Sequence, residues 1–414
     1  MKVLIGPLNI ATQPYYLARG LREHGIDATC ISYGQQKLHH GSDWVVELPG
    51  DPSARAIVFH NTLKEALERD FDIYHFFQRS FYLSYPSKSQ NKLCGFDIPL
   101  LKLRGKKIAY RFTGWELIDR EIEMKNNPYS AFKYGWNGAF DPNLKKEWLA
   151  FVKFYSDAMM VVDPMMQEHC PEAKIVPRVL RVKDFPHIGI EKKSRPLVLH
   201  APTNAIYKGS KFIIKALNDL KNEGVIFDLK LLDRCPFEEA MEWYKRSDII
   251  VDQALIGWHG VLAMECMAMG KPVAVYMRED LVNTPEDIPV YNFNLDNIKQ
   301  RLRLLINDYS SREFLAVRGR DYIIRVHDES VVIPKLIDVY KAILENNKMF
   351  PDTYDDINYL LFQRLDIEQR NINNNYLLIN YFERIKKTSI YYYFRKILSK
   401  LKNLTLQMMK EFSK

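Results

Sequence analysis

The sequence lacks the features that define several large classes of protein. Its 414 residues include only five cysteines, which are scattered and form no CxxC pair, so neither a disulfide framework nor a zinc site is expected. No basic N-terminal segment precedes a long apolar one, and no run reaches the roughly 18 apolar residues that a membrane-spanning helix needs. We therefore expect a cytoplasmic globular protein without a secretory signal.

Two common nucleotide-binding motifs are also missing. No GxGxxG follows the first expected strand, and no GxxxxGK[ST] occurs anywhere, which argues against a dehydrogenase and a P-loop NTPase. Asp70-Phe71-Asp72 has the DxD pattern of some metal-dependent transferases. It directly precedes the apolar run Ile73–Phe77, however, and we interpret Asp72 as the residue that begins a strand. No metal and no resident cofactor are expected.

The chain does contain enough apolar material for large cores, with 47% hydrophobic and 13% aromatic residues. In its first half, apolar runs alternate with an amphipathic pattern, a helix being expected over Gln13–His24. Strands are expected over Lys2–Pro7, Ala28–Ser32, Ile73–Phe77, Lys107–Phe112 and Ala158–Val162. Such alternation predicts a parallel sheet covered by helices on both faces.

A second series follows Asp184–Pro196, whose prolines, glycine and charges indicate a linker between domains. Strands are expected over Leu197–His200, Asp228–Leu232, Asp248–Asp252 and Pro272–Tyr276, and helices over Ser210–Gly224, Pro236–Arg246 and Gly260–Met269. We predict an α/β protein with two doubly wound domains, residues 1–185 and 186–349, that face a cleft. Residues 350–414 are expected to form a basic, aromatic helical extension.

The stretch from residue 248 to residue 280 carries the clearest chemical pattern. An expected strand ends at Asp252, a glycine-containing loop follows, and a short helix begins near Gly260. Free N–H groups at the start of a helix, together with the helix dipole, favour a diphosphate. The residues expected to bind a phosphorylated ligand here are His259, Gly260, Val261 and Leu262.

Glu265 lies one turn further along the same helix. Its sequence neighbours are apolar, namely Ala263, Met264, Cys266 and Met267. An unpaired charge among them would be costly, and a carboxylate can accept hydrogen bonds from both hydroxyl groups of a ribose. We therefore interpret Glu265 as a ligand-binding residue; the alternative is a solvated glutamate in an ordinary strand–loop–helix unit.

This stretch resembles the C-terminal motif of glycosyltransferase family 4 (glycosyl transferases group 1). The family motif has two glutamates eight positions apart. Glu265 matches the second, which binds the nucleotide ribose in the family, and Gly257 stands where the first would contact the donor sugar. The residues after Glu265 that also match are Ala268, Gly270, Pro272 and Val273. The resemblance thus implies nucleotide recognition, but not which sugar is bound.

Leu197–Gly209 resembles the first strand and the Lys-Gly element of the family's second domain. By this likeness Lys208 would neutralise the donor diphosphate and stabilise the leaving phosphate. The family's companion arginine falls on Thr203, which is a departure from the pattern. A solvated lysine at a helix start is the alternative interpretation of Lys208.

The first domain contributes the expected acceptor side. Met1–Gly34 resembles the family's opening unit, and the segment from residue 111 to residue 116 stands where relatives carry a His-Gly-x-Asp element. Thr113 replaces the histidine and cannot serve as a base, so proton transfer would fall to Glu116, to Asp119 or to the donor phosphate. Glu116 as a plain surface residue is the alternative. The acceptor-side candidates are Asn9, Thr12, Gln13, Arg111, Thr113 and Gly114.

The resemblance implies a GT-B fold with two Rossmann-like domains. It also implies sugar transfer from a nucleotide diphosphate sugar to a glycan or lipid-linked acceptor, as in polysaccharide biosynthesis. Two alternatives stay open: a catalytically silent relative that only binds nucleotide or glycan, motivated by the departures at positions 113, 203 and 257, and a nucleotide-sugar epimerase. No nucleic-acid partner is expected.

The positive charge is concentrated at the C-terminal end. From Tyr381 onward, nine basic residues less two acidic ones leave +7 of the formal +8. One apolar stripe at helical spacing comprises Ile390, Phe394, Ile397, Leu401, Leu404 and Met408. A helix over residues 380–414 on an anionic membrane fits this pattern and predicts a peripheral position at the inner face of the membrane. A coiled-coil seam, or a helix packed on the protein's own body, fits equally well.

Overall fold

The computed structural model describes residues 1–34, 41–50, 52–81, 95, 97–138, 142–233, 235–281 and 288–345. The extension expected over residues 350–414 lies outside this range, so its helical character and its membrane contact stay predictions. Among the described residues, no helix has both the length and the apolar character needed to cross a membrane.

The N-terminal domain is built on a seven-stranded parallel sheet with the order β3-β2-β1-β4-β5-β6-β7. The strands are β1 (Lys2–Gly6), β2 (Asp27–Tyr33), β3 (Trp44–Val46), β4 (Ile73–Phe77), β5 (Lys107–Arg111), β6 (Ala158–Val161) and β7 (Lys174–Ile175). β4 is buried along its whole length, as a central parallel strand covered on both faces must be. The strand order changes direction between β1 and β4, which is where such sheets open a crevice.

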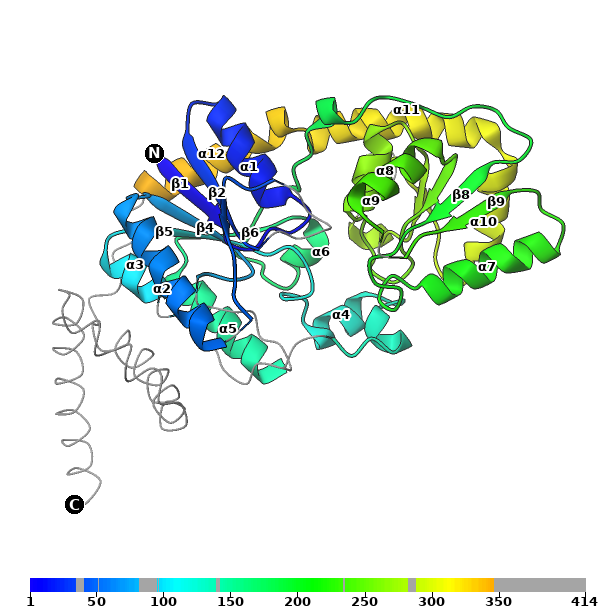
Figure 1. Ribbon diagram of the computed structural model, residues 1–414. Helices are drawn as coiled ribbons and strands as arrows, with labels where there is room; N and C mark the ends of the chain where they lie inside the picture. The colour runs from blue at the N-terminus through cyan, green and yellow to red at the C-terminus, as the bar shows by residue number, and fades with distance from the viewer. Residues whose placement is uncertain are drawn as a thin grey trace, which may run out of the picture.

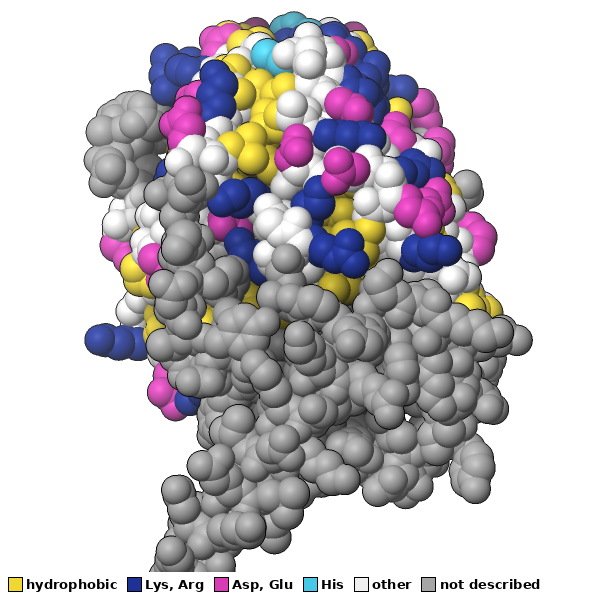
Figure 2. Space-filling model, turned by 90° about the vertical axis from the view of Figure 1, so that its left-hand side faces the viewer, with side chains coloured by type: hydrophobic (Ala, Val, Ile, Leu, Met, Phe, Trp, Pro, Cys, Tyr) yellow, Lys and Arg dark blue, Asp and Glu magenta, His cyan; other side chains and the backbone are white. Residues whose placement is uncertain are grey.

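Helices cover both faces of this sheet, with α1 on one face and α2, α3 and α5 on the other (Figure 1). The helical elements of this part of the chain are α1 (Gln13–Glu23), α2 (Pro52–Glu68), α3 (Asp97–Leu103), α4 (Arg120–Asn126), the 3-10 turn η1 (Ala131–Tyr134), α5 (Pro142–Tyr155), α6 (Pro164–Gln167) and η2 (Val182–Asp184). At the end of this domain, basic and acidic side chains are interspersed (Figure 2). The described part of that face therefore carries charges of both signs.

The C-terminal domain repeats the architecture with a five-stranded parallel sheet of order β12-β11-β10-β8-β9. Its strands are β8 (Leu197–His200), β9 (Asp228–Leu231), β10 (Ile249–Val251), β11 (Val273–Val275) and β12 (Tyr291–Asn292). Its helical elements are α7 (Ser210–Asn222), α8 (Phe237–Arg246), α9 (Val261–Ala268), η3 (Glu279–Leu281), α10 (Ile298–Asn307) and α11 (Tyr309–Val326). Each strand and helix predicted within the described residues is present, with ends that agree to within one or two residues.

The last described helix, α12 (Glu329–Glu345), returns to the N-terminal domain and packs against α1 (Figure 1). The contact is close, because a Cβ added at Gly20 would lie 2.6 Å from the Ile333 side chain. In space, α12 therefore belongs to the first domain, although the sequence boundary of the second domain was drawn at residue 349.

The chain crosses between the domains twice, and the two crossings are hydrogen-bonded to each other. The N–H of Leu180 donates to the carbonyl of His327 at 2.7 Å, and the N–H of Glu329 donates back to the carbonyl of Leu180 at 3.0 Å. Both covalent connections between the domains therefore meet at one place, and we call this pair of crossings the hinge.

Asp70 and Asp72 lie at the end of the first sheet opposite the C-terminal strand ends. Asp72 accepts the N–H of Lys2 at 2.7 Å, and Asp70 forms an ion pair with Lys106. Asp72 thus joins the starts of β1 and β4, as the sequence interpretation supposed, and Asp70 pairs with Lys106 just before β5.

Candidate functional site

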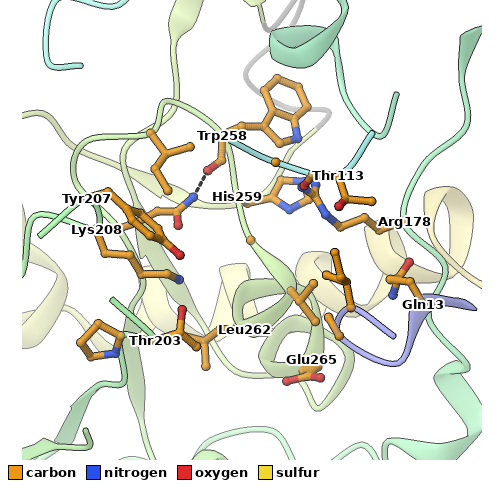
Figure 3. A pocket seen from close by; sticks show the side chains of 18 of the residues that line it. Gln13, Thr113, Arg178, Thr203, Tyr207, Lys208, Trp258, His259, Leu262 and Glu265 are labelled. Atoms are coloured by element: carbon orange, nitrogen blue, oxygen red, sulfur yellow. Dashed lines mark hydrogen bonds between the residues drawn. The ribbon is translucent and has the colours of Figure 1, made fainter. Parts of the chain in front are cut away.

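A cleft of about 480 Å³ lies between the two domains. Its N-terminal wall comes from the loops after β1 and β5, from α4 and from the segment after β7. Its C-terminal wall comes from the loops after β8 and β10 and from α8 and α9. Figure 3 shows Gln13, Thr113 and Arg178 of the first domain on one side of the cleft and Thr203 and Lys208 of the second on the other. The strands thus deliver their C-terminal loops to one shared space, as predicted for doubly wound domains.

Asp252 organises the start of α9. It is fully buried at the end of β10, where its Oδ2 accepts the N–H of Gly260 at 3.2 Å and its Oδ1 accepts a hydrogen bond from Lys208 Nζ at 2.7 Å. Lys208 is therefore not a solvated lysine, because its ammonium group is held at the cleft wall in a buried ion pair. The carboxylate is also favourably placed against the positive end of the helix dipole. The N–H groups of Val261 and Leu262, which have no partner within a helix, follow in the first turn.

Glu265 projects from α9 into the cleft, where Figure 3 shows its carboxylate at the wall. Within the described part of the chain, no hydrogen-bond donor and no cation reaches this carboxylate. Desolvation by the surrounding protein raises the pKa of Glu265 from its ordinary 4.5 to about 8. The structure thus brings the predicted ribose-binding residue to the cleft without a protein partner.

One end of the cleft beside Glu265 is apolar. It is lined by Leu232, Phe237 and Ala240 and by the ring of Tyr244. Burial, and after it the charge of Glu265, raises the pKa of the Tyr244 phenol well above its ordinary value. An apolar group suits this slot better than a charged one, because these four described residues carry no charge.

His259 lines the cleft just before the start of α9 and is nearly fully buried. Its Nε2 lies 3.1 Å from the hydroxyl of Tyr322, which also lies 3.3 Å from Nε2 of His327. Burial, with His327 and Arg178 nearby, holds the pKa of His259 well below its ordinary value. His259 is therefore a neutral polar group, and it adds no positive charge for a phosphate.

Glu116 lies behind the β5–α4 loop, outside the cleft lining. Its carboxylate accepts the N–H groups of Thr113 and Gly114 at 2.5 and 3.0 Å, and the Nε2 amide of Gln78 at 2.9 Å. Only 1% of its surface is exposed, so it is not a plain surface residue. Burial raises the pKa of Glu116, and the backbone N–H groups oppose that shift. This geometry favours a role in holding the loop, and a catalytic role for Glu116 stays a prediction.

The acceptor-side candidates divide into two groups. Thr12, Gln13, Thr113 and Gly114 line the cleft. The Gln13 amide is nonetheless occupied, since it exchanges two hydrogen bonds of 2.8 Å with the backbone of Val179. Asn9 and Arg111 lie outside the lining. Asn9 donates to the carbonyl of Gly41 at 2.9 Å, and the fully buried Arg111 donates to the carbonyls of Val176 and Pro177.

Arg178 and Glu123 are among the cleft residues that escaped the sequence reasoning. Arg178 follows β7 and reaches the cleft, where its Nη1 pairs with Asp163 at 3.1 Å and its Nη2 donates to the carbonyl of Thr113 at 3.2 Å. Glu123 of α4 lines the cleft from the same domain. Neither belongs to a motif, and both reach the cleft only through the packing of segments that the sequence does not pair.

The structure gives a physical reason for the glycine at position 257. Gly257 has φ +87°, and an added Cβ would lie 2.8 Å from Cγ and 2.9 Å from Cδ of Arg278. Arg278 in turn forms two hydrogen bonds, at 2.7 and 2.9 Å, with the Glu168 carboxylate of the first domain. A glutamate side chain at position 257 would therefore be both strained and obstructed by an interdomain ion pair.

Comparison with known proteins supports this architecture. No protein-family model matches the sequence. An uncharacterized glycosyltransferase of Methanocaldococcus jannaschii is 22% identical over 148 residues, which are 33% of this chain and 38% of that relative. The match thus spans well under half of the relative's length.

Two solved structures superpose on most of the chain. Sucrose-phosphate synthase from Thermosynechococcus elongatus has 11% identity and a TM-score of 0.55, over 83% of this chain and 98% of that one. The catalytic domain of starch synthase IV from Arabidopsis thaliana, bound to ADP and acarbose, has 11% identity and a TM-score of 0.56, over 84% and 100%. The chain therefore has the GT-B fold of these glycosyltransferases, with two Rossmann-like domains that face one cleft.

Proposed function

We propose that this protein is a glycosyltransferase that moves a sugar from a nucleotide diphosphate sugar to a hydroxyl group of a glycan or lipid-linked acceptor. The observation that carries the proposal is the carboxylate of Glu265, which faces the interdomain cleft one turn from the start of α9 without a protein partner. A pair of ribose hydroxyls would donate hydrogen bonds to this partly exposed carboxylate, to which no described protein group donates.

The neighbouring walls suit the other parts of such a donor. The apolar slot around Phe237 and Tyr244 accommodates a nucleobase beside Glu265. The first turn of α9 offers N–H groups to the diphosphate, and Lys208 lies next to that turn with its charge held in place by Asp252. The starch synthase structure with a similar fold was determined with ADP, which supports a nucleotide in the corresponding cleft.

In the proposed reaction, the oxygen of the acceptor hydroxyl forms a bond to the anomeric carbon of the donor sugar. The bond between that carbon and the diphosphate oxygen breaks, and its electron pair stays on the departing nucleoside diphosphate. Lys208 and the α9 N–H groups stabilise the charge that develops on the phosphate. The hydroxyl proton leaves with the phosphate or with a carboxylate of the cleft. No resident metal takes part in this proposal.

The donor site is tested by nucleotide binding. Isothermal titration with UDP, GDP and ADP identifies the nucleotide, and Glu265→Ala is expected to weaken its binding about tenfold, as for the loss of hydrogen bonds to the ribose hydroxyls. Glu242→Ala on the exposed face of α8 is the matched control. Equal affinity in the wild type and Glu265→Ala would refute the assignment of this site.

Turnover separates an enzyme from a binding protein. Purified protein is incubated with UDP-glucose, UDP-N-acetylglucosamine, GDP-mannose and ADP-glucose, with and without EDTA, and released nucleoside diphosphate is measured. Nucleotide binding without release from any donor would indicate a silent relative, and a converted donor sugar without release would indicate an epimerase. Release that EDTA abolishes would contradict transfer without a metal.

We further propose that residues 380–414 bring the enzyme to an anionic membrane, where a lipid-linked acceptor would lie. The support is the basic and apolar patterning of that segment. Full-length protein should pellet with vesicles that contain phosphatidylglycerol, and Lys396, Lys400 and Lys402 changed together to Glu should prevent it. Equal pelleting with purely zwitterionic vesicles would exclude the electrostatic part of this idea.

A further inference from the structure

A second carboxylate at the cleft has an unsatisfied oxygen. Glu123 lies on α4 of the first domain, lines the cleft and has only 1% of its surface exposed. Its Oε1 accepts a hydrogen bond from Asn127 Nδ2 at 2.8 Å. Its Oε2 is buried and has no hydrogen-bond partner among the described residues. Buried carboxylate oxygens are ordinarily satisfied, so this one points to a group that the protein itself does not supply.

His169 presents a complementary atom to the same oxygen. The N–H of Asp119 donates to Nδ1 of His169 at 3.0 Å, which assigns the proton of the neutral ring to Nε2. That Nε2 lies 3.7 Å from Glu123 Oε2, beyond hydrogen-bond reach, and it too has no hydrogen-bond partner within the described ranges. An acceptor and a donor thus face each other across a gap. A hydroxyl group, which donates one hydrogen bond and accepts others, is complementary to both.

Asn127 ties this pair to the loop that leads into α9. It is fully buried, and its Nδ2 lies 3.1 Å from the carbonyl of Leu255 and 3.3 Å from that of Ile256, while its Oδ1 accepts the hydroxyl of Tyr276 at 3.1 Å. A Cβ built on Gly257 would lie 3.5 Å from the same Asn127 nitrogen. Through Asn127, the Glu123 carboxylate of the first domain is therefore held beside the loop of the second domain that contains Gly257. At Gly257, Arg278 leaves no room for a side chain.

We infer that Glu123, with His169 behind it, binds a hydroxyl group of the donor sugar. The inference rests on the proposed function, because it assumes that the nucleotide lies along α9. We assign the hydroxyl to the donor sugar because Asn127 holds Glu123 against the loop that leads into α9, where the diphosphate is proposed to bind. Sugar recognition then comes from the first domain, and nucleotide recognition comes from the second.

The test compares each nucleotide sugar with its own nucleoside diphosphate. Dissociation constants are measured by isothermal titration for UDP and UDP-glucose, and likewise for the GDP and ADP pairs, in the wild type and in Glu123→Gln. Glutamine keeps an oxygen that can accept the Asn127 hydrogen bond but loses the negative charge, so the variant should fold. Glu121→Gln, an exposed position on the same helix, is the matched control.

Glu123→Gln is expected to weaken binding of the nucleotide sugar about tenfold, the effect of losing a hydrogen bond to a charged group, while the nucleoside diphosphate binds within twofold of the wild type. Unchanged affinity for both ligands would overturn the inference, and so would an equal loss for both, since that reports a structural role. Failure of the proposed function is a separate result. No nucleotide would then bind to either protein, and the inference would fall with it.

Discussion

The protonation of Glu265 should be visible in how stability depends on pH. The folded protein holds the pKa of this carboxyl near 8, against an ordinary 4.5. Because the folded pKa is the higher one, folding takes up a proton between these values. Stability therefore falls as pH rises from about 4.5 toward 8 and then levels off. Each pH unit in that window changes the free energy of unfolding by about 1.4 kcal/mol.

The same reasoning fixes the size and sign of a mutational effect. At pH 7 the desolvation of Glu265 costs at most roughly 3 kcal/mol, since about two and a half pH units of the window have been crossed, and solvent in the cleft lowers this cost because the side chain is partly exposed. Glu265→Gln cannot ionise and keeps the shape of the protonated side chain. We expect the variant to match the wild type near pH 4.5 and to exceed its free energy of unfolding by up to roughly 3 kcal/mol at pH 7.

Urea denaturation of both proteins at half-unit pH steps from 4.5 to 9 measures this difference directly. The difference between the two proteins is the informative quantity, because other titrating groups affect both curves alike and cancel. The matched control is Glu242→Gln, since Glu242 is exposed. Glu168→Gln would not serve as a control, because Glu168 pairs with Arg278 across the domain interface. A difference that stays flat across the whole pH range would refute the reasoning and would place the pKa of Glu265 near its ordinary value.

Two further predictions follow from contacts around the cleft. Lys208→Met should lower the free energy of unfolding by about 3–5 kcal/mol, because it leaves the buried Asp252 carboxylate without its cation. Adding Asp252→Asn to this variant should recover part of that loss in urea denaturation. A further loss from the second substitution would contradict the pairing. Gly257→Ala should lower the free energy of unfolding more than Gly105→Ala does. Both glycines have positive φ, which costs about 1–3 kcal/mol for a non-glycine residue. Only at position 257 would the added Cβ also lie 2.8 Å from the Arg278 side chain. If thermal and urea unfolding show equal losses of stability for the two variants, the Arg278 side chain moves away from the added Cβ at no measurable cost.

Much of the fold and part of the site are local properties that the sequence determines by itself. Apolar runs of strand length such as Ile73–Phe77, and the helix stop at Gly25, predict parallel α/β units because burial on two faces requires that pattern. The link from Asp252 through the loop to Glu265 is likewise contained in one strand–loop–helix segment. Its neighbours in sequence are its neighbours in space, so the position of Glu265 at the cleft was predictable.

Only the tertiary structure decided which groups are already occupied. Lys208 pairs with Asp252, which lies 44 positions further along the chain. Gln13 is bonded to Val179, 166 positions away. Glu116 holds its own loop, whereas Glu123 of the next helix lines the cleft. The side of the cleft that a residue faces, and the partner it meets there, depend on how α4, α12 and the hinge bring distant segments together. No short-range pattern encodes the Lys208–Asp252 and Gln13–Val179 contacts, because each joins segments of one domain that are distant in sequence and meet only through the packing of its strands and loops.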